Sequence, residues 1–166
     1  MEFNWIMVFA AALIPLVVGA VYYHPKVLGN AWMRASGLTE ESLKGGNMAL
    51  IFGLTYLFSL MLGVSLTFMV IHQAHLYSTV LNEPGYNDPY SEVGRMISSF
   101  LEKYGSNFRT FKHGALHGVL TGLFLALPIL GVNALFERKS FKYIASHTGY
   151  WVIALALMGG VLCAYM

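Results

Sequence analysis

Four long stretches of the chain contain no Asp, Glu, Lys or Arg, and the segments that separate them hold nearly all of the charged residues. About 20 apolar residues are enough for a helix to cross a hydrocarbon core of about 30 Å. The pattern therefore predicts membrane spans at about residues 4–23, 48–71, 114–136 and 146–165. We expect an all-α membrane protein, a bundle of four transmembrane helices in a single integral membrane domain, residues 1–166, with both termini on one side.

The long connection between the second and third spans has a different pattern, in which apolar residues recur at helical spacing opposite charged ones. The apolar positions are Val93, Met96, Ile97, Phe100, Leu101 and Tyr104. They predict an amphipathic helix at about residues 89–104 that lies on the membrane or docks on a partner. Asp88 is expected to cap this helix, Pro89 to be its first residue, and Gly105 to end it.

Composition and charge agree with a membrane protein. The chain is 57% hydrophobic and 11% charged, whereas a globular domain has roughly 25% charged residues. The net charge of +2 is too small to suggest a nucleic-acid partner. Lys and Arg number six in the first and third connections and four in the longer second one, which favours a cytoplasmic first and third connection. In a bacterial inner membrane both termini would then be periplasmic.

Small residues spaced four apart line one side of several spans, and such residues let helix backbones approach closely in lipid. The predicted packing positions are Thr55, Ser59 and Gly63 in the second span, Gly114, Gly118 and Gly122 in the third, and Gly160 in the fourth. We expect the second and third helices to pair through these faces. Pro15 is expected to bend the first helix, because proline removes a backbone hydrogen bond.

Histidines supply the candidate chemistry. His72 and His75 end the second span and His113 and His117 begin the third, so four spans place all of them at one membrane face. Four imidazoles could hold Zn²⁺ or another transition metal, and His117 with a histidine of the second helix could hold a haem. The alternative is structural: these histidines bond water, headgroups or backbone, and His117 bonds the second helix.

For that structural bond of His117, Thr67 and Gln73 are the expected partners on the second helix. The acidic residues all lie outside the spans, which argues against an ion-coupled transporter. The sequence contains no phosphate-binding loop, no paired carboxylates and no recognisable spacing of a nucleophile with a base. We therefore predict a protein that is not an enzyme.

Several short motifs resemble the DUF1761 family of small bacterial integral membrane proteins. They are Gly19-Ala20-Val21-Tyr22-Tyr23-His24-Pro25, Gly29-Asn30-Ala31-Trp32, His117-Gly118, Asn133-Ala134-Leu135-Phe136-Glu137-Arg138-Lys139-Ser140 and Gly149-Tyr150. Tyr22 stands where many members of the family have tryptophan. The resemblance implies a four-helix membrane protein and supplies no reaction.

Two functional hypotheses follow. The first is a non-catalytic accessory or scaffold subunit of a larger membrane complex, without a cofactor, whose partners are the lipid bilayer and other membrane subunits or further copies of itself. The second is a membrane protein that handles a metal, a haem or a small transported molecule through His72, His75, His113 and His117.

Overall fold

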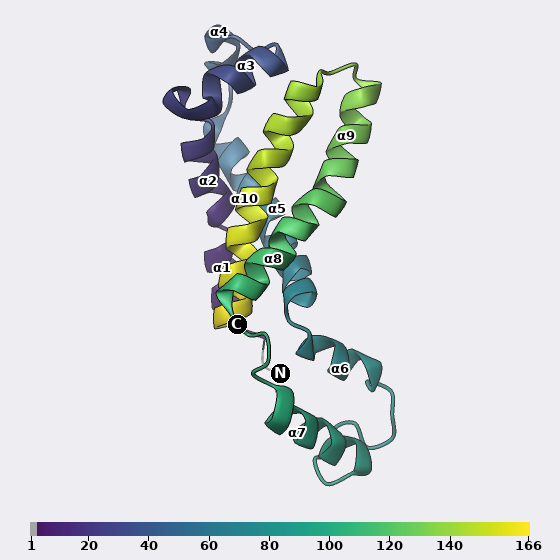
Figure 1. Ribbon diagram of the computed structural model, residues 1–166. Helices are drawn as coiled ribbons and strands as arrows, with labels where there is room; N and C mark the ends of the chain where they lie inside the picture. The colour runs from purple at the N-terminus through teal and green to yellow at the C-terminus, as the bar shows by residue number, and fades with distance from the viewer. Residues whose placement is uncertain (1–2) are drawn as a thin grey trace.

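The computed structural model describes residues 3–166, and this range is helical apart from turns and short connections (Figure 1). The first half contains α1 (Trp5–Ala11), α2 (Ile14–Tyr22), the π-helical η1 (Pro25–Gly29), α3 (Asn30–Ser36), α4 (Glu40–Leu43), α5 (Met48–Val70) and α6 (Gln73–Thr79). The second half contains α7 (Glu92–Tyr104), α8 (Phe111–Thr121), the π-helical η2 (Gly122–Ala126), α9 (Leu127–Phe136) and α10 (Phe141–Tyr165). The predicted all-α fold is confirmed.

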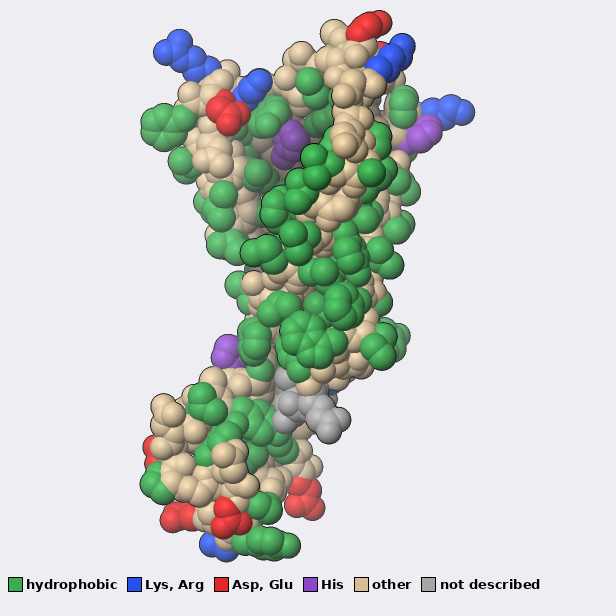
Figure 2. All heavy atoms as spheres, turned by 180° about the vertical axis from the view of Figure 1, so that it is seen from behind, with side chains coloured by type: hydrophobic (Ala, Val, Ile, Leu, Met, Phe, Trp, Pro, Cys, Tyr) green, Lys and Arg blue, Asp and Glu red, His purple; other side chains and the backbone are tan. Residues whose placement is uncertain are grey.

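Within residues 3–166, four helical stretches are long and apolar enough to cross a membrane. They are Trp5–Tyr22, Met48–Val70, Phe111–Phe136 and Phe141–Tyr165. Figure 2 shows a hydrophobic waist on one face of the molecule, with charged side chains gathered towards its two ends. The third and fourth stretches begin earlier than predicted because Thr110 and Ser140 cap them, accepting hydrogen bonds from the backbone N–H of His113 and Tyr143.

Two of the spans are interrupted near a proline. The first is divided between α1 and α2 at residues 12–13, and Pro15 lies in the first turn of α2, which agrees with the predicted bend. In the third span the π-helical η2 precedes Pro128, which lies in the first turn of α9. Proline donates no backbone hydrogen bond, so both breaks occur where the helical ladder is already weakened.

Helix α10 is the central helix of the bundle. In its most apolar stretch 50% of the residues are buried, compared with 11–22% in the corresponding stretches of the other three spans. The buried core residues are Val8, Ala11, Leu66, Val70, Ile71, Leu155, Met158, Leu162 and Cys163. The first five belong to the first half of the chain and the last four to α10. One core therefore joins the two halves of the protein.

The second and third helices do not pair through the predicted faces, because the glycines of α8 pack on α10. A Cβ at Gly118 would fall on the carbonyl oxygen of Leu155 and lie 2.6 Å from the Cα of Ala156. A Cβ at Gly114 would fall on the carbonyl oxygen of Gly159. Two glycines thus face each other across α8 and α10, and the backbones come into direct contact.

The other predicted packing residues have varied surroundings. Gly63 of α5 faces Val8 of α1, since a Cβ added to Gly63 would lie 3.3 Å from Val8 Cγ1, and Ser59 is buried. Gly122 of η2 lies against both the backbone and the side chain of Val152 in α10, since an added Cβ would lie 2.8 Å from Val152 Cα and 2.7 Å from its Cγ2. Gly160 of α10 lies against the ring of Phe111. Thr55 is half-buried and donates its hydroxyl hydrogen bond to Ile51 O of its own helix at 2.7 Å.

The amphipathic helix α7 begins at Glu92, three residues later than predicted. The Asp88 side chain accepts a hydrogen bond from Tyr90 N at 2.9 Å and so closes a turn before the helix. Ser91 is the N-cap, and its Oγ accepts from Gly94 N at 2.9 Å. Gly105 ends the helix as predicted. Helices α6 and α7 lie beyond the end of the bundle where α1 begins and α10 ends, opposite α3 and α4 (Figure 1).

Arg109 ties the segment before α8 to the end of α10. Its Nε–H donates to Cys163 O at 3.0 Å, one of the last carbonyls of that helix, where a cation is favoured by the helix dipole. We expect Arg109→Ala to lower the free energy of unfolding by about 1 kcal/mol. Thermal unfolding in detergent measures this, with Arg34→Ala, at an exposed position of α3, as the control. Equal melting temperatures for the two variants would contradict the prediction.

Candidate metal centre

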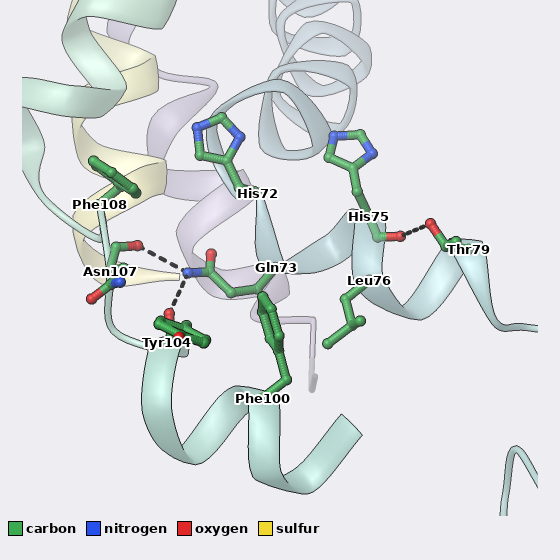
Figure 3. Close-up of a pocket in the computed structure, with 9 residues that line it drawn as sticks. All are labelled: His72, Gln73, His75, Leu76, Thr79, Phe100, Tyr104, Asn107 and Phe108. Carbon is green, nitrogen blue, oxygen red and sulfur yellow. Dashed lines mark hydrogen bonds between the residues drawn. The ribbon is translucent and has the colours of Figure 1, made fainter. Parts of the chain in front are cut away.

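A break between α5 and α6 positions His72. Ile71 is extended there, with φ −108° and ψ 93°, and its side chain is fully buried in the core. On the other side of His72, the buried Gln73 donates from Nε2 to Asn107 O at 2.9 Å and to Tyr104 O at 3.3 Å (Figure 3). The residues on both sides of His72 are therefore held firmly, one in the bundle and one against the end of α7.

The first turns of α8 position the other two histidines. Thr110 caps the helix by accepting from His113 N at 3.2 Å, so His113 lies within the first turn. His117 follows four residues later, and residues four apart share one face of a helix. The ring centroids of His113 and His117 are 4.5 Å apart.

His72, His113 and His117 together form a group that we call the histidine triad. Nε2 of His72 lies 2.8 Å from Nε2 of His113, and one ring nitrogen from each of the three residues lies within 4.8 Å of the others. A tetrahedral zinc ion with Zn–N bonds of about 2.0–2.1 Å holds its nitrogens about 3.3 Å apart. The nitrogen–nitrogen distances in the triad start at 2.8 Å and do not exceed 4.8 Å, so they lie on both sides of the spacing of about 3.3 Å that zinc requires. Modest rotations of the rings would complete such a site.

His75 does not belong to the triad, although the sequence grouped it with the other three. Figure 3 shows that its ring stands apart from that of His72, further along α6. The proposed hydrogen bonds of His117 are also wrong. Thr67 donates instead to Gly63 O at 2.9 Å, and the side-chain amide nitrogen of Gln73 donates to the two carbonyls described above.

Phe108 is a neighbour of the triad that sequence reasoning missed. Its ring centroid is 5.0 Å from that of His113 and 6.2 Å from that of His72. Its φ of +62° is in the left-handed region, which is unusual for a bulky residue. Because phenylalanine gives no sequence signal for this conformation, the pattern could not have indicated that its ring would turn towards the histidines.

The environment of His72 favours its neutral form. Burial lowers the pKa of His72 below its ordinary value of 6.5, and positive charge on His113 and on His75 lowers this pKa further. Neutral imidazole is the form that donates a lone pair to a metal.

Metal-free protein is expected to lose thermal stability as the pH falls from about 7.5 to about 5. The unfolded chain binds a proton at His72 more readily than the folded chain, since the folded pKa is the lower one. The contribution of His72 is therefore complete above pH 6.5 and is lost as the pH falls through the folded pKa. Melting temperatures across this range should fall less for His72→Gln, and an unchanged fall would count against the prediction.

Cavities lie on both sides of the triad. One of about 550 Å³ borders α6 and α7, outside the spans, and His72, Leu76, Phe100 and Phe108 are among the residues that line it (Figure 3). The other, of about 530 Å³, follows the ends of two spanning helices. Its lining residues are Met69, His117, Leu120, Thr121, Phe124 and Leu125. The triad thus has an extramembrane side and a bundle side.

The fold and this site define a small multi-pass membrane protein that carries a cluster of histidines at one end of its bundle. The model of the family described as "Protein of unknown function (DUF1761)" matches residues 6–163. The chain therefore belongs to the DUF1761 family, which confirms the resemblance noted in its sequence. A comparison with curated proteins finds no match, and a comparison with solved structures finds none.

The residues that carry the family resemblance gather mainly at the opposite end of the bundle, and the tyrosines among them join the first half of the chain to α10. Tyr22 donates its hydroxyl hydrogen bond to Ser146 O at 3.0 Å, and Tyr150 donates to Pro15 O at 3.0 Å. The ring of Tyr23 lies 5.0 Å from that of Trp32, measured between centroids. These four aromatic residues of the motifs therefore have a packing role, whereas His117 belongs to the triad.

Proposed function

We propose that this protein binds one transition-metal ion, with zinc as the reference ion, at His72, His113 and His117. The observation that carries the proposal is the convergence of three imidazoles from two separate parts of the chain, with ligand nitrogens within 4.8 Å of one another. Three histidines are the protein ligands of some zinc sites that keep a fourth position open for water or another ligand.

A purely structural role accounts for the triad less well. Two imidazoles 2.8 Å apart can share one proton as a hydrogen bond. The third ring adds nothing to that bond, yet its centroid lies 5.0 Å from that of His72 and 4.5 Å from that of His113. A metal ion gives all three rings a common partner.

The predicted role as an accessory or scaffold subunit of a membrane complex remains a proposal beside this one. A bound metal ion is compatible with it, and so is the predicted absence of catalysis. We place the protein in a bacterial inner membrane with both termini periplasmic, on the strength of the bias in Lys and Arg between the connections. In that orientation the triad would face the periplasm.

Metal analysis of the purified protein tests the proposal. After treatment with a chelator and titration with zinc in detergent, we expect one zinc ion per chain and a raised melting temperature. Zinc at 100 times its dissociation constant would stabilise the folded chain by about 2.7 kcal/mol. Zinc binding no stronger than that of His72→Ala would overturn the proposal, and a Soret band in the protein as isolated would assign the rings to haem instead.

A further inference from the structure

The cavity on the bundle side of the triad, which we call the membrane groove, opens towards lipid. It is formed by residues of α5 and of α8–η2, both of which belong to predicted spans. Leu120 is 40% exposed and Phe124 is 76% exposed, so the groove communicates with the outer surface of the bundle. Because bilayer surrounds that surface, the molecules that reach the groove are those dissolved in the bilayer.

His117 gives the groove a polar end at a defined depth. It lies six residues after Phe111, the first residue of α8, which corresponds to about 9 Å along the helix axis. Each headgroup region of a bilayer is about 5–8 Å thick. His117 is thus near the level at which headgroups give way to acyl chains, where the polar end of a lipid-like molecule resides.

The charge of a loaded site favours an anion as the additional ligand. Three neutral imidazoles leave the full +2 charge of a zinc ion uncompensated, and the metal-binding group found within residues 3–166 contains histidines alone. Lys112 adds another positive charge on the same helix. An anionic oxygen ligand would lower the electrostatic cost of holding this charge at the edge of the hydrocarbon core.

From these three observations we propose that the open position of the metal takes the anionic oxygen head of a single-chain bilayer amphiphile, whose hydrocarbon chain lies in the membrane groove. A long-chain carboxylate is the simplest such molecule. The inference rests on the proposed metal site, because the groove on its own would hold only a hydrocarbon chain and would not select its head. The α6–α7 cavity on the other side leaves the metal ion a route to water.

Cobalt-substituted protein tests the inference, because the visible absorption of Co²⁺ reports changes in its ligands. In a neutral maltoside detergent we expect oleate to change this spectrum at a concentration at least about 100-fold lower than acetate does, since acetate has the same head but no chain to bury. If no cobalt spectrum forms, the proposed function itself fails. If the cobalt spectrum forms but oleate does not change it, or if acetate changes it at the same concentration as oleate, only the present inference fails.

Two matched variants test the role of the groove. Leu120→Trp fills it and should weaken the response to oleate at least about tenfold. Leu123→Trp alters a leucine of similar exposure, 41%, on the same spanning helix but outside the groove, and should respond like the original protein. An equal response in both variants would overturn the inference. If Leu120→Trp fails to bind cobalt, Phe124→Ala supplies the comparison, and an unchanged response to oleate in that variant would overturn it as well.

Discussion

Replacing Gly118 by valine is expected to leave little folded protein in the membrane. The first added atom would fall on the carbonyl oxygen of Leu155, and the backbone of α10 cannot move aside as a flexible side chain could. Overpacking a core with extra methylenes commonly costs about 1–3 kcal/mol, and here α8 and α10 would have to separate along the contact between Gly114 and Gly159 as well. Since total stability is only about 5–15 kcal/mol, such a loss is severe.

Gly131→Val is the matched control, because Gly131 lies in the same spanning stretch and a Cβ there would meet no atom of another helix within 4 Å. The amount of monodisperse protein in detergent and its melting temperature measure the effect. Gly118→Ala should fall between the original protein and Gly118→Val, because it adds the first atom of the clash and no more. Similar yields and melting temperatures for Gly118→Val and Gly131→Val would refute the proposed helix contact.

Replacing His113 by alanine is expected to weaken zinc binding by at least about 100-fold. Partners that merely orient a metal ligand commonly change affinity by about 10- to 100-fold, so the loss of a ligand should cost no less. His113 is the best position for testing the metal site, because it contacts both of the other histidines. Its Nε2 lies 2.8 Å from that of His72, and its ring lies beside that of His117. Competition with a coloured chelator measures the affinity.

His75→Ala is the control for this experiment, since His75 lies close by in the sequence but outside the triad. It should bind zinc as the original protein does. Circular dichroism of each metal-free variant would show whether the helices remain. A loss of zinc in His75→Ala equal to that in His113→Ala would place the ion elsewhere.

The spans could be predicted from the sequence because they depend on a one-dimensional property, the length of an uncharged stretch. The pairing of the helices could not be predicted, because a face of small residues can pack closely against any of several neighbouring helices. Gly114 and Gly118 pack on α10 and not on α5, because Gly159 lies opposite Gly114 and lets the two backbones come into contact. The start of α7 was misplaced for a comparable reason: Asp88 and Ser91 both favour a helix start, and Asp88 is used in a turn.

The candidate site was only partly predictable. The number of spans was enough to bring four histidines to one membrane face. The grouping of three histidines in the triad, without His75, depends on the break between α5 and α6 at Ile71. No proline or glycine lies beside Ile71 to indicate this break in the sequence. The break is stabilised instead by burial of Ile71 and by hydrogen bonds from Gln73 to residues more than thirty positions away. Long-range contacts of this kind leave no local pattern.

The shared core between the two halves of the chain suggests a use in protein engineering. His72 belongs to the first half, and His113 and His117 belong to the second, while the exposed turn around Pro84 lies between them. Two fragments that end and begin at this turn would each lack half of the core. Co-expressed, they would form a split membrane reporter, whose reassembly should be strengthened by added zinc and could be followed by fluorescence complementation.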